Sequence, residues 1–149
     1  METQRLYRGR LIDHLHLVVA DLDAARRFYT AIFGVLNIPI AGNGDDYFWA
    51  DELFVSTADS QAALGKLTGR HHLAFQAKDR AAVDAWYRAG LAAGGIDNGA
   101  PGERPYHPGY YAAFLLDPAG NNIEAVFHGE ANQNVDAVVV EFDAPVGSS

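Results

Sequence analysis

The chain has 149 residues, of which 49% are hydrophobic and 20% charged, a composition typical of a folded globular protein. Its net charge of −8 argues against a nucleic-acid or anionic-membrane surface, and the absence of cysteine excludes disulfides and thiolate metal sites. Because no apolar run approaches the roughly 18 residues of a membrane span and the N-terminus lacks a signal-peptide core, we expect a cytoplasmic protein.

The first regular element is predicted after an N-terminal arm, residues 1–10, which has no clear periodicity. From Leu11 to Val19, apolar residues alternate with the period of a β-strand. This alternation places His14 and His16 on one face of the strand. Asp21 is then a candidate N-cap for an amphipathic helix.

Three short strands are predicted after this helix. One lies near 36–40, and the other two, at 47–50 and 53–57, are predicted to form a hairpin. With the first strand and the helix they make a βαβββ module over residues 11–57. Residues 58–69 are predicted to be a linker.

A second copy of this pattern follows at an offset of 58 residues, which aligns Asp21 with Asp79. The same offset aligns His14 with His72, and Asp79 is again placed to cap a helix. Each copy of a strand-plus-helix unit therefore opens with a histidine. A single histidine on a strand is more often structural than functional, but its recurrence favours a functional role.

The second module is predicted to span residues 70–128. Its segment Gly99 to Gly109 holds three prolines and three glycines, so we expect a shaped loop of the kind that borders binding sites. Two strands, 110–116 and 122–128, follow it, and the DPAGN sequence between them predicts a hairpin turn.

Each module is too small to bury its own sheet, so we expect an α+β fold in which two βαβββ modules pack around a pseudo-two-fold axis. With the helices on the outer faces, His14 and His72 would line an open cleft formed by the concave faces of the sheets. The modules would form one domain over residues 11–128. The tail, 129–149, contains a candidate edge strand at 137–142.

Glu124 lies on the last predicted strand, where it would face the same cleft. A carboxylate in such an apolar strand is costly unless it is paired or metal-bound. Two imidazoles and one carboxylate suit a divalent metal ion with open positions, namely Fe, Mn, Ni, Co or Zn. His14, His72 and Glu124 are therefore the candidate ligands.

Further candidates lie near this set. His16 shares the face of His14, where it would contact substrate or support the site, the alternative being a satisfied core histidine. Tyr110 and His107 are candidates for proton transfer, with a solvated rim as the alternative. Tyr111, beside the same loop, is a candidate substrate contact.

Three motifs carry a family resemblance: DHLHLVVADLDAARRFY, HHLAFQAKDRAAVDAWY and LLDPAGNNIEAV. Over residues 11–128 the chain resembles the vicinal oxygen chelate superfamily of glyoxalase I, bleomycin-resistance proteins, fosfomycin-resistance transferases and extradiol dioxygenases. The resemblance implies one divalent metal ion on His14, His72 and Glu124, a small-molecule substrate that chelates it through adjacent oxygens, and a homodimer. It also places Phe114 in the cleft as an apolar wall of the substrate site.

The resemblance favours lactoylglutathione-lyase-like chemistry or a related reaction at a metal-bound oxyanion. Two alternatives stay open: the first is an extradiol-type dioxygenase and the second is a binding protein. Glyoxalase I usually has a fourth ligand, where this chain offers only Ser56 or Thr57. Extradiol dioxygenases commonly have a tyrosine ten residues before the ligand glutamate, where this chain has Phe114. The second alternative is a bleomycin-resistance-type binding protein, which needs no metal.

Overall fold

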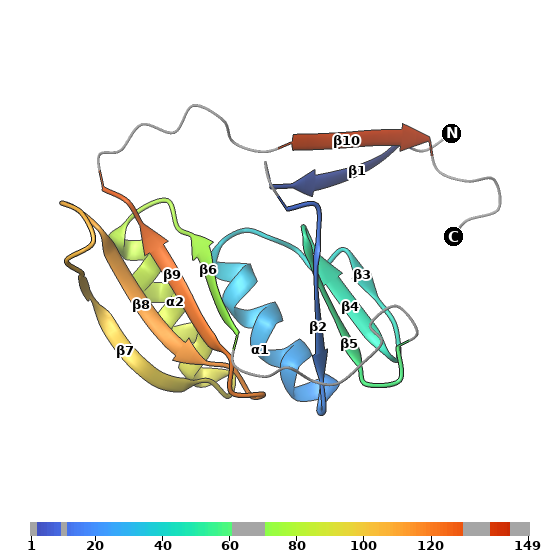
Figure 1. Ribbon diagram of the computed structural model, residues 1–149, viewed down its shortest axis with the longest axis horizontal. Helices are drawn as coiled ribbons and strands as arrows, with labels where there is room; N and C mark the ends of the chain where they lie inside the picture. The colour runs from blue at the N-terminus through green and yellow to red at the C-terminus, as the bar shows by residue number, and fades with distance from the viewer. Residues whose placement is uncertain (1–2, 10–11, 61–70, 130–137, 144–149) are drawn as a thin grey trace.

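The computed structural model describes residues 3–9, 12–60, 71–129 and 138–143. Two four-stranded sheets and two helices form the body of the molecule, and a two-stranded sheet lies at one end of it (Figure 1). Neither helix in the described part of the chain combines the length and the apolar character that a bilayer span requires.

The first sheet belongs to module one and has the strand order β2-β5-β4-β3, with β2 parallel to β5. In chain order its elements are β2 (Leu15–Val19), α1 (Leu22–Val35), β3 (Gly42–Asn43), β4 (Tyr47–Ala50) and β5 (Leu53–Thr57). The strand predicted near 36–40 is wrong. The backbone turns there instead, because Asn37 adopts a left-handed conformation with φ of 60° and Ile38 N–H bonds back to the Phe33 carbonyl.

The second sheet repeats this topology with the order β6-β9-β8-β7 and a parallel β6–β9 pair. Its elements are β6 (His72–Gln76), α2 (Arg80–Ala92), β7 (Ile96–Glu103), β8 (Tyr111–Leu116) and β9 (Asn122–Phe127). The α+β fold with two βαβββ modules is thereby confirmed. The loop predicted from Gly99 starts later than expected, because β7 runs to Glu103 as an edge strand whose register shifts tolerate glycine and proline.

Both helices begin at the predicted N-caps. The Asp21 carboxylate accepts a hydrogen bond of 3.0 Å from the Ala24 N–H, and Asp79 accepts one of 2.7 Å from the Ala82 N–H. Each carboxylate satisfies a backbone donor that the first helical turn leaves unpaired. The repeat in the sequence therefore reports a repeat in the backbone.

The two helices lie between the two sheets and pack against each other (Figure 1). Large buried side chains of both helices, including Phe28, Tyr29 and Trp86, join the inner faces of both sheets in one core. With the helices in this position, no helix or strand of the described residues covers the other face of either sheet. We expected the helices on the outside and the histidine-bearing faces opposed, but in one chain these faces point away from each other.

A buried hydrogen bond links the two modules. Asp117, in the turn between β8 and β9, is 2% exposed and accepts a 2.7 Å bond from the Tyr29 hydroxyl of α1. The same carboxylate accepts bonds from the Ala119 and Asn121 backbone N–H groups and from the Asn121 side chain. The predicted hairpin turn is therefore also an anchor for the helix of module one.

The two-stranded sheet joins segments from near both ends of the chain. β1 (Thr3–Arg8) pairs antiparallel with β10 (Val138–Asp143), with Leu6 opposite Val140. The arm predicted at 1–10 thus contains a strand, and the candidate edge strand at 137–142 is present with a shift of one residue. Most of the predicted linker lies outside the described residues, as do tail residues 130–137 and 144–149.

Candidate active site

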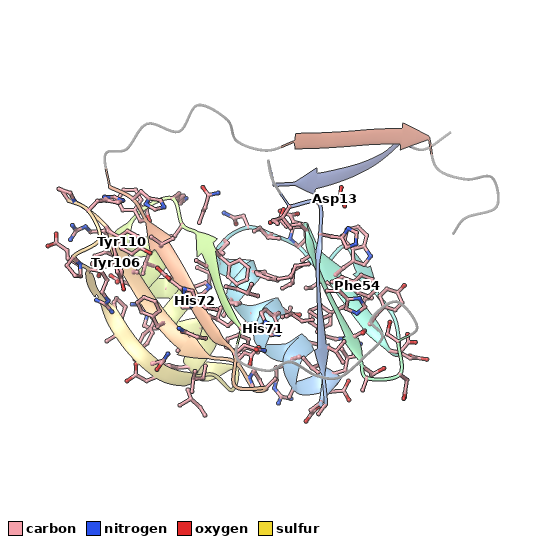
Figure 2. The ribbon with its side chains drawn as sticks, viewed as in Figure 1. Asp13, Phe54, His71, His72, Tyr106 and Tyr110 are labelled. Carbon is pink, nitrogen blue, oxygen red and sulfur yellow. The ribbon has the colours of Figure 1, made fainter. Side chains whose placement is uncertain are left out.

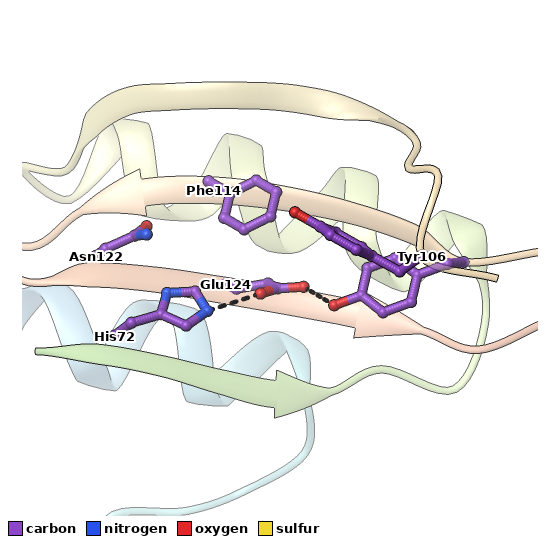
Figure 3. Close-up of a pocket in the computed structure, with 6 residues that line it drawn as sticks. His72, Tyr106, Phe114, Asn122 and Glu124 are labelled. Carbon is purple, nitrogen blue, oxygen red and sulfur yellow. Dashed lines mark hydrogen bonds and ion pairs between the residues drawn. The ribbon is translucent and has the colours of Figure 1, made fainter.

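A pocket of about 300 Å³ opens on the uncovered face of the second sheet (Figure 3). Strands β6, β8 and β9 supply its floor, and the turn between β7 and β8 supplies two tyrosines. The lining residues are His72, Tyr106, Tyr110, Phe114, Asn122 and Glu124. The volume is at the lower end of the range for small-molecule sites.

Glu124 is the central residue of this pocket. It is 3% exposed, and its Oε1 lies 3.0 Å from His72 Nε2 across the parallel β6–β9 pair. Its Oε2 accepts a hydrogen bond from the Tyr110 hydroxyl, as the dashed lines in Figure 3 show. A buried carboxylate needs such partners to offset its lost hydration. The His72 side chain is 48% exposed, so one side of this pair is open to a ligand.

Tyr110 is a proton donor in this arrangement. Burial, followed by the hydrogen bond and the charge of Glu124, raises the pKa of Tyr110 to about 12. The hydroxyl therefore keeps its proton at neutral pH and donates a hydrogen bond to the carboxylate. It is a positioned neutral donor at the pocket floor.

His107 and His128 form a stacked pair at the edge of the pocket, with ring centroids 5.2 Å apart. His107 Nδ1 lies 2.9 Å from the Pro108 carbonyl, which can only accept, so this nitrogen carries the hydrogen. His107 Nε2 lies 2.9 Å from His128 Nδ1, within hydrogen-bond distance. Both ring nitrogens of His107 are engaged, and its contact with Tyr110 is edge-to-face between the rings.

His16 lies on the uncovered face of the first sheet, on the far side of the helices from the pocket. Its Nε2 lies 2.7 Å from Ser56 Oγ, which itself donates to the Thr57 carbonyl, so His16 is the donor. Burial, followed by the charge of His14, lowers the pKa of His16. An aromatic layer completes this face, with Phe54 edge-on to His16 at 4.8 Å and Tyr47 stacked on Phe54 at 5.5 Å.

His14 is well exposed, with its Nδ1 2.7 Å from Asp13 Oδ1. Figure 2 shows Phe54 on the first sheet and Asp13 in the segment that leads into β2, with α1 between these residues and His72 of the second sheet. His14 therefore does not join His72 and Glu124 within one chain. Among the described residues, no group of three or more histidine, aspartate or glutamate side chains is placed to hold a metal ion.

The other predicted residues divide between the two faces of β8. Phe114 and Tyr110 line the pocket. Tyr111 points to the helix side, where its hydroxyl donates a 2.7 Å bond to Asp84 of α2. Tyr106 and Asn122 also line the pocket but were not predicted. Alternation with Glu124 could have identified Asn122, whereas no periodic signal exists for Tyr106 in its irregular turn.

Comparison with known proteins adds a family assignment. Residues 11–125 match the model of the glyoxalase/bleomycin resistance protein/dioxygenase superfamily. An uncharacterized protein of Pseudomonas aeruginosa is 36% identical over 121 residues, a match that covers 76% of this chain and 85% of the relative. The matched region includes both modules.

Solved structures agree with this assignment. A glyoxalase/bleomycin resistance protein from Albidiferax ferrireducens is 28% identical with a TM-score of 0.59, over 78% of this chain and 97% of that one. A lactoylglutathione lyase from Agrobacterium tumefaciens is 25% identical with a TM-score of 0.58, over 79% and 93%. The duplicated βαβββ topology and these matches together show that the chain belongs to the glyoxalase/bleomycin resistance protein/dioxygenase superfamily.

Proposed function

We propose that this protein is a divalent-metal-dependent enzyme that acts on a small molecule with two adjacent oxygens, through lactoylglutathione-lyase-like chemistry or a related reaction. The observation that carries the proposal is the buried Glu124 carboxylate, paired with His72 at the floor of an open pocket. The resemblance of this chain to the Agrobacterium tumefaciens lactoylglutathione lyase supports the reaction class.

The donor atoms in the pocket fit a transition-metal ion in part. An imidazole nitrogen and a carboxylate oxygen are suitable ligands for Fe, Mn, Ni, Co or Zn. The Tyr110 hydroxyl donates a hydrogen bond to the carboxylate, and such a bond commonly orients a metal ligand. Two protein ligands are fewer than such sites usually have. The set in one chain is therefore incomplete.

A second copy of the chain would complete it. His14 is well exposed and immediately precedes β2 of the first sheet, so a two-fold pair can bring it against the pocket of the other copy. The metal would then be held by His72, Glu124 and His14 of the partner subunit. The homodimer that we propose is for this reason a requirement of the site.

Bound metal would supply Lewis-acid stabilisation of negative charge that develops on a substrate oxygen. The residues of the chain have separate tasks. Glu124 and His72 would hold the metal ion. Tyr110 keeps a proton close to the Glu124 carboxylate at neutral pH. Phe114 excludes water from one wall of the pocket.

A metal-free binding protein is the second candidate, and the aromatic lining favours it. Tyr106, Tyr110 and Phe114 present three rings to a ligand, which suits a planar molecule. A dioxygenase is less favoured, because Phe114 lacks the hydroxyl that a tyrosine would supply at this place in the pocket. Measured metal content separates the metal-dependent enzyme from the metal-free binding protein.

A subunit-mixing experiment tests the shared site. His14→Ala and His72→Ala chains are purified separately, then mixed, unfolded reversibly and refolded so that heterodimers form. Zinc is then added to the refolded mixture and to each refolded variant alone. A shared site leaves one intact set in each heterodimer, since one chain keeps His72 and Glu124 and the other keeps His14. Zinc content should be low in each variant alone and should rise in the mixture.

Two results would contradict the proposal. Mixing without any recovery of zinc would show that the two histidines do not act across a dimer. Wild-type protein that binds no divalent metal, but binds a planar ligand tightly, would replace the enzyme with the binding protein.

A further inference from the structure

Arg104 lies on the same uncovered face of the second sheet as the pocket. Its guanidinium carbon is 5.3 Å from the centroid of the Phe114 ring, a cation–π arrangement. The His72 ring is also stacked on Phe114, with centroids 6.1 Å apart. The Arg104 guanidinium and the His72 imidazole therefore both lie against the same ring, which lines the pocket.

The local sequence fixes the guanidinium in this place. Its Nη2 donates a 2.7 Å bond to the Ala100 carbonyl, and its Nη1 donates a 3.3 Å bond to the Glu103 carbonyl. A Cβ at Gly99 would lie 3.3 Å from Nη2, and one at Gly102 would lie 3.0 Å from Nη1. The two glycines of the bulged strand thus leave the space that the guanidinium occupies, and its orientation is set before any ligand binds.

The charge of Arg104 is not neutralised by a carboxylate among the described residues. Both acceptors are backbone carbonyls, and the nearby Glu103 carboxylate pairs instead with Arg80 at 2.7 Å. In a chain of net charge −8, a positioned cation that has no carboxylate partner in the described part of the chain suits an anionic ligand in the neighbouring pocket.

We propose that Arg104 binds a carboxylate group of the substrate, at the opposite end from the adjacent oxygens that the His72–Glu124 end takes. A guanidinium presents parallel N–H donors that match the planar carboxylate, and its single charge balances one negative charge. The substrate class is then a small organic acid with two further adjacent oxygens. This inference rests on the proposed function only for the end of the ligand that carries the two adjacent oxygens.

Two probes of nearly identical shape test the role of Arg104. The first, 3,4-dihydroxybenzoate, carries adjacent oxygens and a separate carboxylate, and the second, 3,4-dihydroxybenzamide, replaces the carboxylate with a neutral amide. Isothermal titration of zinc-loaded and zinc-free homodimer measures the affinity for each. In wild-type protein the benzoate should bind about tenfold more tightly or better, as expected for a charge-assisted pair.

Variants assign this preference to one side chain. Arg104→Gln should remove the preference for the benzoate while affinity for the benzamide stays the same, and Arg104→Lys should keep part of it. Arg88→Gln is the matched control, because it removes the same charge from an exposed arginine of α2, on the helix side of the second sheet, and leaves the Arg80–Glu103 pair intact. It should keep the full preference. Thermal unfolding of each variant checks that β7 remains folded.

The possible failures can be distinguished. Equal binding of the two probes to wild-type protein, or a preference that survives in Arg104→Gln, would overturn the role of Arg104. A preference that disappears in Arg104→Gln supports the role even if zinc has no effect on affinity. In that case the independence from zinc would count against the metal-dependent function alone.

Discussion

The two sheets have the same topology and opposite chemical character on their uncovered faces. The face of the second sheet holds a buried carboxylate, a tyrosine donor and an arginine around a pocket. The face of the first sheet holds a neutral His16–Ser56 pair and stacked aromatic rings. The two modules share the frame that the core requires, whereas the residues on their uncovered faces differ in chemistry.

The largest expected effect comes from removing the carboxylate of the second face. Glu124→Gln keeps the size of the side chain but removes the charge that would hold the metal. Zinc affinity should fall by more than the roughly 10–100-fold that the loss of a supporting partner costs. Competition with a chelator measures this, and Ser56→Ala on the first face is the control. Retention of wild-type zinc affinity by Glu124→Gln would mean that the site is elsewhere.

Tyr110 and Tyr111 give the next comparison, because these neighbours donate to carboxylates on opposite faces of the second sheet. Tyr110→Phe should lower turnover by roughly 10²–10⁴-fold without a change in metal content, since it removes a positioned proton donor. Tyr111→Phe should leave turnover unchanged. Steady-state rates are measured on the methylglyoxal–glutathione hemithioacetal and on catechols. A similar loss in both variants would point to a structural effect.

Tyr29 and Tyr87 correspond through the repeat, and each donates to an aspartate, but only the first bond is buried. Tyr29→Phe should lower the free energy of unfolding by about 1.5–3 kcal/mol, because it removes a buried bond to a charged acceptor. Tyr87→Phe should leave the urea midpoint close to that of the wild type. Equal midpoints for the two variants would show that burial does not distinguish these bonds.

The pH dependence of stability gives the smallest effect. Burial, followed by Asp117, raises the pKa of Tyr29 well above its ordinary value of 10.0. The contribution of this bond should therefore be complete below about pH 10 and decline as pH rises towards the folded-state pKa, since only the unfolded state ionises readily in that window. The stability difference between wild type and Tyr29→Phe, measured by urea unfolding, should shrink above pH 10. A constant difference would contradict the assigned cause.

Local signals in the sequence predicted most of the fold. Asp21 and Asp79 preceded helical patterns and cap both helices, and the DPAGN turn is a hairpin. The pairing of β1 with β10 escaped prediction, because it joins residues near opposite ends of the chain and has no local signature. The strand β7 was not recognised because it contains two glycines and a proline, which an edge strand with register shifts accepts.

The composition of the candidate site was predictable only within each face. Alternation along β9 correctly groups Glu124 with Asn122, and the repeat relates His72 to His14. Alternation cannot say whether the helices lie outside the two sheets or between them, because either arrangement buries the same leucines. Tyr106 lines the pocket and Arg104 lies over the Phe114 ring, and both come from a segment without periodicity. The contacts that place them therefore appear only in the structure.

The helices between the sheets also fix the angle at which the two uncovered faces diverge. In the proposed homodimer the first-sheet face of each copy contacts the second-sheet face of the other. Both contacts can form at once only if the angle between the two faces is compatible with a two-fold axis. Gly90 lies within the helix contact, where a Cβ would be 2.2 Å from Leu115 Cδ1 and 3.1 Å from Ile32 Cγ2. A larger residue there would have to displace the ends of the Leu115 and Ile32 side chains. Gly90 therefore lets the two helices and β8 pack closely, and this packing sets the direction in which each uncovered face points.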